Sequence, residues 1–164
     1  MDPTDLQPME KWIELENEIY TRTGLDASVF DPDGIRITGN KNWANQLCPV
    51  IKANPKGQTF VCSAAHQNIA AQAEQTKKPV IEECDAGMLK IVVPVYLNDQ
   101  FIGAVGGCGL LLGEDGEIET FLLGKTLEMD ENELEVLAEG IGSLTRQQAE
   151  ETCEFIVNYL DKLH

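Results

Sequence analysis

The chain has 164 residues, with 28 Asp and Glu against 12 Lys and Arg, which gives a formal net charge of -16. This length fits one domain, and an apolar fraction of 43% indicates a globular protein and excludes a disordered acidic tail. The acidity and the lack of any Lys/Arg-rich run argue against binding to nucleic acid or to an anionic membrane surface, because both require basic residues. The longest uncharged apolar stretch, residues 101–113, is too short to span a bilayer, and the acidic N-terminus does not resemble a signal peptide. We therefore expect one soluble, cytoplasmic domain over residues 1–164, with its core at about 6–163.

The first third of the chain predicts a helix followed by a β-hairpin. Apolar residues at helical spacing indicate a helix over 4–23, capped by Thr4 or Asp5 and ended by Gly24. The β-rich runs 27–30 and 35–38 flank Asp31-Pro32-Asp33-Gly34. Pro presets φ for a turn and Gly accepts a positive φ, so this segment predicts a hairpin.

The remainder predicts a helical insert, three strands and a helical end. Residues 39–56 are expected to be irregular or in short helical turns, and the Ala-rich segment 58–77 to be a helix. Strands follow over 80–84, 88–97 and 100–112, then helices near 117–124, 130–139 and 144–163, the last capped by Thr145. This order predicts an α+β fold of the PAS or GAF type: a five-stranded antiparallel sheet with helices on one face and flanking N- and C-terminal helices.

Four cysteines and a histidine in the middle of the chain are the candidates for chemistry. Cys62 and His66 are spaced i, i+4 on the predicted helix and so share one face. Cys48 lies in the insert, Cys84 ends a strand and Cys108 lies in the glycine-rich strand. Such a set suits zinc or an iron–sulfur cluster. No Cys-x-x-Cys pair is present, so the spacing also permits the alternative that these are small buried residues.

Motifs of common enzymes are missing. There is no G-x-S-x-G elbow, and Gly103-Ala104-Val105-Gly106-Gly107 runs inside a strand without the lysine or helix of a phosphate-binding loop. No histidine or acidic pair has an evident orienting partner. We expect no enzymatic activity.

Several segments together resemble the PocR sensory domain. They are Asp31-Pro32-Asp33-Gly34, Cys48-Pro49-Val50-Ile51, Cys62 at the start of its helix, Lys78 to Met88 with the turn Cys84-Asp85-Ala86-Gly87, and the hairpin Pro94 to Gly107. The resemblance runs from about Leu6 to Leu163. It implies a PAS-like, non-catalytic module that senses small molecules such as simple diols and related hydrocarbon derivatives.

The resemblance also implies that Cys48, Cys62 and Cys84 converge on one site, since they match the cysteines that recur in the family. Cys108 stands where family members commonly have glutamine, and many lack a histidine at the position of His66. These two departures favour a bound metal. Family members are typically fused to output domains, for which this chain has no room, so a protein output partner or a longer parent protein is expected.

The sequence thus predicts a signal-sensing domain with a cysteine-lined pocket for a metal ion or cluster, a small molecule, or both. The alternatives are a metal-free sensor of a small organic ligand such as a short diol, and an interaction module that forms a homodimer through its terminal helices. The metal would be zinc or a [4Fe–4S] cluster, held by Cys48, Cys62, Cys84 and Cys108, with His66 as a substitute ligand. The predicted ligand-binding residues are Trp43, Cys48, Cys62, His66, Cys84, Met88 and Cys108.

Overall fold

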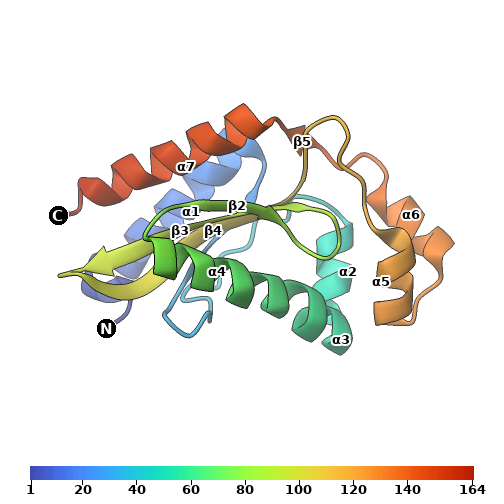
Figure 1. The fold of residues 1–164 in the computed structure, drawn as a ribbon, viewed down its shortest axis with the longest axis horizontal. Helices are drawn as coiled ribbons and strands as arrows, with labels where there is room; N and C mark the ends of the chain where they lie inside the picture. Colours follow the sequence, from blue (N-terminus) through green and yellow to red (C-terminus); the bar gives the residue numbers. More distant parts are fainter.

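An open, five-stranded sheet forms the centre of the computed structural model, which describes residues 1–164 (Figure 1). Four strands pair antiparallel in the order β1-β4-β3-β2, and the short β5 pairs parallel with the end of β4. The predicted α+β class is confirmed. The strands are β1 (Asp26–Phe30), β2 (Val80–Glu83), β3 (Leu89–Leu97), β4 (Gln100–Leu112) and β5 (Ser143–Leu144).

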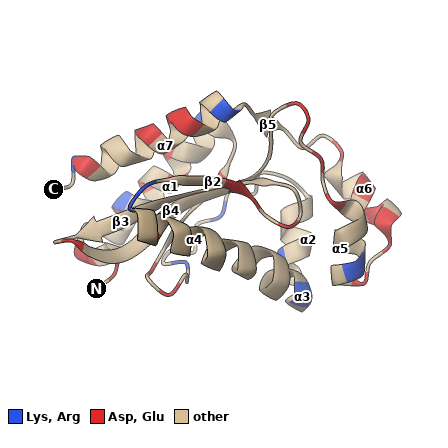
Figure 2. Cartoon of the chain, viewed as in Figure 1, with Lys and Arg blue, Asp and Glu red and all other residues tan.

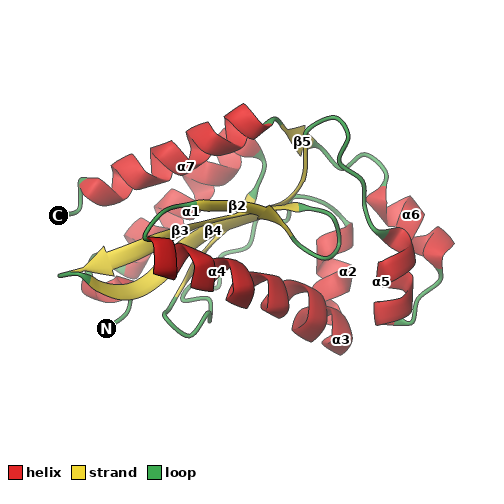
Figure 3. Ribbon diagram, viewed as in Figure 1, coloured by secondary structure: helices red, strands yellow, loops and turns green.

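Helices cover both faces of this sheet (Figure 3). The terminal helices α1 and α7 lie on one face, α4 lies on the other, and the short helices gather near one end of the sheet (Figure 1). The helical elements are the 3-10 turn η1 (Pro3–Asp5), α1 (Met9–Thr23), α2 (Leu47–Ala53), α3 (Pro55–Gly57), the π-helix η2 (Gln58–Ser63), α4 (Ala64–Thr76), α5 (Thr120–Leu127), α6 (Glu131–Ala138) and α7 (Arg146–Asp161).

Alternation along β3 divides the interior into two sides. Leu89, Ile91 and Val93 join the main core with α1 and α7, whereas Val92 packs with Ile69 and Ala73 of α4. Because successive side chains of a strand point to opposite faces, Lys90 lies on the same side as Val92. The face toward α4 is therefore the one that carries a charged residue.

The helix ends confirm two of the predicted helix boundaries and correct a third. Gly24 adopts a left-handed conformation after α1, and Thr145 forms a capping box with Gln148 at the start of α7, both as predicted. The predicted start of the first helix at residue 4 is wrong. Pro8 sits just before α1 in an extended conformation, and proline is not tolerated inside a helix, so residues 3–5 form a separate turn.

The predicted hairpin is only half formed. The turn is present, with Gly34 N–H donating to Asp31 O at 3.0 Å, but residues 35–38 make a single bridge, Phe30 with Arg36, and no strand. The side chains of this segment bind elsewhere: Arg36 pairs with Asp26 and Thr38 bonds to Glu16. These side-chain contacts accompany a single bridge where a regular strand was predicted.

The apolar stripes of the terminal helices are used within the chain itself. Trp12, Leu15 and Ile19 of α1 and Ile156 and Leu160 of α7 are buried in the main core. The homodimer through these helices stays a prediction.

Charge is distributed unevenly over the surface. Acidic side chains recur along α6, α7 and the segment between β4 and α5 (Figure 2). No helix combines the length and the apolar character that a membrane crossing requires.

Candidate functional site

A cavity of about 440 Å³ lies between the sheet face toward α4 and the inserted helices. Its walls come from β1, the 33–41 segment, α2, η2, α4, the turn between β2 and β3, and the strands β3 and β4. Six of the seven predicted ligand-binding residues line it: Cys48, Cys62, His66, Cys84, Met88 and Cys108. Trp43 does not line it. The structure brings the six together, and their binding of a ligand stays a prediction.

The strand register supplies the floor of this cavity. Cys108 of β4 pairs with Lys90 of β3 on one side and with Asp26 of β1 on the other. Residues paired across a sheet share a face, so these three side chains lie on the same face as Phe30, which is four residues from Asp26 along β1. Gly106 lies between them, and a Cβ there would come within 3.2 Å of the Phe30 ring. Glycine at this position therefore lets the ring lie across β4.

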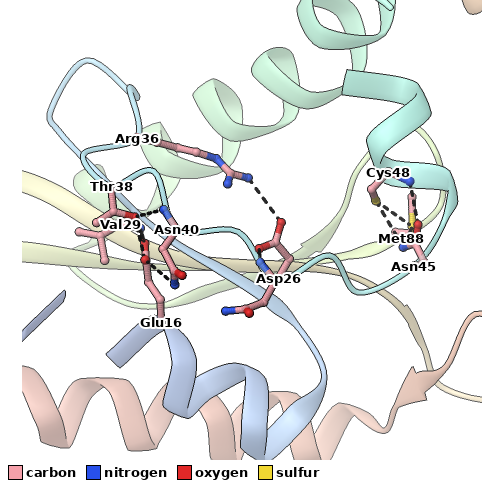
Figure 4. A network of polar contacts seen from close by, with 10 residues as sticks. Glu16, Asp26, Val29, Arg36, Thr38, Asn40, Asn45, Cys48 and Met88 are labelled. Atoms are coloured by element: carbon pink, nitrogen blue, oxygen red, sulfur yellow. Dashed lines mark hydrogen bonds and ion pairs between the residues drawn. The ribbon is translucent and has the colours of Figure 1, made fainter. Parts of the chain in front are cut away.

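The roof is held by Asn45 and by an irregular stretch of helix. The Asn45 side chain accepts from the Cys48 N–H (Figure 4). It also accepts from the Leu47 N–H and donates to Gly109 O at 2.6 Å, so it fixes the start of α2 against β4. Cys62 lies in the π-helix that runs into α4. Insertions of this kind are frequent at functional sites.

The turn between β2 and β3 brings three further residues to the cavity. Cys84 N–H donates to Met88 O at 2.8 Å, and Gly87 N–H donates to Cys84 O at 2.9 Å. Gly87 has a φ of +89°, which favours glycine. This tight turn places Cys84, Ala86 and Met88 in the wall.

Three of the four cavity thiols, those of Cys48, Cys62 and Cys84, are favoured in their neutral form. Burial raises the pKa of Cys48, Cys62 and Cys84, with further contributions from neighbouring cysteines. Cys48 Sγ lies 3.7 Å from Met88 Sδ. No three His, Cys, Asp or Glu side chains lie close enough together to hold a metal ion. A metal would therefore have to displace thiol protons and draw the cysteines closer.

Four basic residues that the sequence analysis did not single out also line the cavity: Arg36, Lys41, Lys52 and Lys90. Trp43 lies beside two of them, with the Lys41 and Lys52 ammonium groups 4.8 and 5.5 Å from its ring centroid. The sequence marks Lys90 as unusual, because it is the one charged residue in the apolar run 88–95. Lysine is almost never fully buried without a partner, so its position in a buried strand is informative.

His66 stacks on Phe30 at the centre of this basic group. The ring centroids are 3.7 Å apart, and neither imidazole nitrogen has a hydrogen-bond partner. Burial lowers the pKa of His66 to about 3, with added repulsion from Lys90, Arg36 and Lys52. The imidazole is therefore neutral at pH 7 and has one free donor and one free acceptor.

The segment that carries Arg36 is tied down by a buried carboxylate. Glu16 of α1 accepts from Val29 N–H at 2.9 Å, from the Thr38 hydroxyl at 2.7 Å and from the Asn40 amide at 3.2 Å (Figure 4). Burial raises the pKa of Glu16, and these hydrogen bonds oppose the shift. Arg36 can then reach Asp26, with Nη2 at 3.6 Å from Oδ2.

Comparison with known proteins identifies the family. Residues 5–164 match the family described as the sensory domain found in PocR. The chain belongs to the PocR sensory domain family. The sequence resemblance is thereby confirmed over almost the whole chain. No curated protein and no solved structure matches it.

Membership assigns a sensory role to the chain. In this PocR sensory domain, the cavity between the sheet and the inserted helices has the size of a small-molecule site, since such sites usually measure about 300–1,000 Å³.

Proposed function

We propose that this PocR sensory domain is a non-catalytic receptor that binds a small organic molecule in the 440 Å³ cavity and signals to a protein output partner. The observation that carries the proposal is the convergence of unpaired polar groups on a partly apolar cavity. Buried polar groups are nearly always hydrogen-bonded, yet both nitrogens of His66 and Nη1 of Arg36 have no partner. A bound molecule would supply these partners.

The absence of catalytic activity belongs to the same proposal. Burial raises the pKa of the Cys48, Cys62 and Cys84 thiols, which opposes the thiolate that a cysteine nucleophile needs. His66 donates to no side chain and accepts from none, so it has no orienting partner.

All five cysteines are free, which fits a reducing compartment.

Thermal-shift screening with short diols, alcohols, organic acids and amides tests the proposal. A ligand that binds only the folded state raises the melting temperature by mass action. Ala65 lines the cavity and Ala71 is exposed on the same helix, α4. Ala65→Trp should abolish the stabilisation and Ala71→Trp should preserve it. Stabilisation that survives Ala65→Trp, or no stabilising compound in the whole set, would overturn the proposal.

A metal ion or cluster is the second candidate, and one observation favours it. Cys48, Cys62, Cys84 and Cys108 all line a single cavity, while Cys153 lies in the main core between α7 and the sheet. Thiolates from four such positions could hold zinc or a [4Fe–4S] cluster after local rearrangement, with His66 as a substitute ligand.

Anaerobic purification followed by metal, sulfide and visible-absorption analysis tests the metal candidate. Cys48→Ser should remove the metal or the colour, whereas Cys153→Ser should leave both. A colourless, metal-free and stably folded protein would exclude this candidate and leave the organic ligand.

A further inference from the structure

The charge of the cavity is opposite to that of the molecule. Four of the 12 Lys and Arg residues line it, against one of the 28 Asp and Glu residues, Asp33. Asp26 lies beneath and pairs with Arg36, so it neutralises one of the four. In a chain with a net charge of -16, this concentration of positive charge creates a local potential that attracts anions.

Lys90 is the strongest sign of an anionic ligand. It is 7% exposed, it sits in a central strand, and it takes part in none of the five ion pairs. Its ammonium lies 5.4 Å from the centroid of the Phe30 ring. An ammonium group in a largely enclosed position gains more from an anionic partner than it would in bulk water, and the protein supplies no carboxylate within ion-pair distance.

Two other residues with unpartnered nitrogen atoms lie beside the same aromatic ring. The Arg36 guanidinium lies 5.9 Å from the Phe30 centroid, with Nη1 buried and unpartnered, and His66 stacks on that ring with both nitrogens free. Three separate parts of the chain thus meet at the Phe30 ring: β3 through Lys90, the 33–41 segment through Arg36, and α4 through His66. Guanidinium and ammonium groups bind carboxylate and phosphate through charge-assisted hydrogen bonds.

Apolar residues form another part of the wall. Ile51, Val61 and Met88 are buried and line the cavity. We propose that the ligand is a small organic anion, with a carboxylate or phosphate group between Lys90 and Arg36 and an apolar body against Phe30 and these three residues. This inference rests on the proposed function and names the class of molecule sensed.

Matched pairs of anionic and neutral probes test the class. Isothermal titration calorimetry with benzoate against benzamide, and butanoate against butanamide, compares molecules of similar shape that differ in charge. Phenyl phosphate and inorganic phosphate form the phosphate arm, and butanediol the neutral hydroxyl arm. We expect at least one organic anion to bind. Its neutral counterpart should bind with an affinity lower by a factor of roughly ten or more, because it lacks one charge-assisted hydrogen bond.

Two lysine variants separate a ligand-binding role from a structural one. Lys90→Met should weaken binding of the anion roughly 10- to 100-fold, and it should not lower the melting temperature of the empty protein, because Lys90 forms none of the five ion pairs. Lys78→Met removes the same charge from an exposed position outside the cavity and should change neither quantity. Arg36→Gln, in a segment outside the sheet, gives a second measure of affinity if Lys90→Met fails to fold.

The outcomes distinguish the inference from the function on which it rests. Neutral probes that bind as tightly as the anions, with affinities unchanged by Lys90→Met and Arg36→Gln, would overturn the anionic class and leave the sensor function intact. A complete lack of binding by anionic and neutral probes alike would overturn both. Anion binding that is equally weakened by Lys78→Met would show attraction to the surface and would also reject the inference.

Discussion

At the residue scale, the cavity keeps polar groups that folding alone would disfavour. His66 is 4% exposed and makes no hydrogen bond, and Nη1 of Arg36 is buried without a partner. A buried polar group without a partner costs roughly 1–3 kcal/mol. Such groups weaken the empty protein, and a ligand that satisfies them is stabilising for the same reason. This is the arrangement expected of a receptor whose fold responds to occupancy.

His66 gives a prediction for the pH dependence of stability. Its pKa is lowered to about 3 by burial and by Lys90, Arg36 and Lys52, so the unfolded chain binds a proton below pH 6.5 while the folded chain does not. Stability from this group is therefore complete above pH 6.5 and is lost as the pH falls toward 3. Between pH 7.5 and pH 5 the loss is about 2 kcal/mol. Urea unfolding at both pH values measures it.

The matched variants for this prediction are His66→Phe and His164→Asn. Phenylalanine can keep the stack on Phe30 but does not titrate. The difference in free energy of unfolding between wild type and His66→Phe should therefore shift by about 2 kcal/mol between the two pH values. His164 is the only other histidine and is exposed at the C-terminus, so His164→Asn should follow wild type. Parallel pH profiles for wild type and His66→Phe would contradict the assignment.

At the element scale, local signals in the sequence predicted the regular elements well. The strands 88–97 and 100–112 appear as β3 and β4 within one residue at their ends, and Gly24 and Thr145 bound their helices. The failures involve long-range partners. Residues 35–38 have β propensity, but Arg36 and Thr38 are drawn to Asp26 and Glu16. The four cavity cations were missed for a similar reason: their convergence depends on the packing of separate elements and not on spacing along the chain.

The turn between β2 and β3 gives a prediction for backbone geometry. Gly87 and Gly140 both have positive φ, but a Cβ at Gly87 would come within 2.2 Å of Glu117 O, whereas one at Gly140 would meet nothing within 4 Å. Gly140→Ala should cost about 1–2 kcal/mol for the left-handed conformation alone. Gly87→Ala adds a clash with the backbone and should cost roughly 3 kcal/mol or more. Denaturant unfolding of the two variants measures the difference, and equal losses would contradict the expected clash with Glu117 O.

At the scale of the whole molecule, two charge distributions of opposite sign coexist. The outer surface carries most of the 28 acidic residues, while the cavity holds four basic ones. Repulsion among like surface charges destabilises the compact state. Within the cavity, burial lowers the pKa of Lys41, and repulsion from Arg36 and Lys52 lowers it further. Salt should screen the exposed charges far more than the enclosed ones.

This difference predicts that salt stabilises the protein. Raising NaCl from about 10 mM to about 150 mM shortens the screening length from about 30 Å to about 8 Å, so the melting temperature should rise. Glu135 and Glu154 are exposed on α6 and α7 and form none of the five ion pairs. The double variant Glu135→Gln/Glu154→Gln should be more stable than wild type at low salt and should gain less from added salt.

Repeating the series with sodium sulfamate in place of chloride separates screening from anion binding in the cavity, because screening depends on ionic strength and site binding depends on the anion. If Lys90→Met abolishes the salt-dependent rise in melting temperature seen in wild type, the effect belongs to the cavity. That result would reject surface repulsion as its cause.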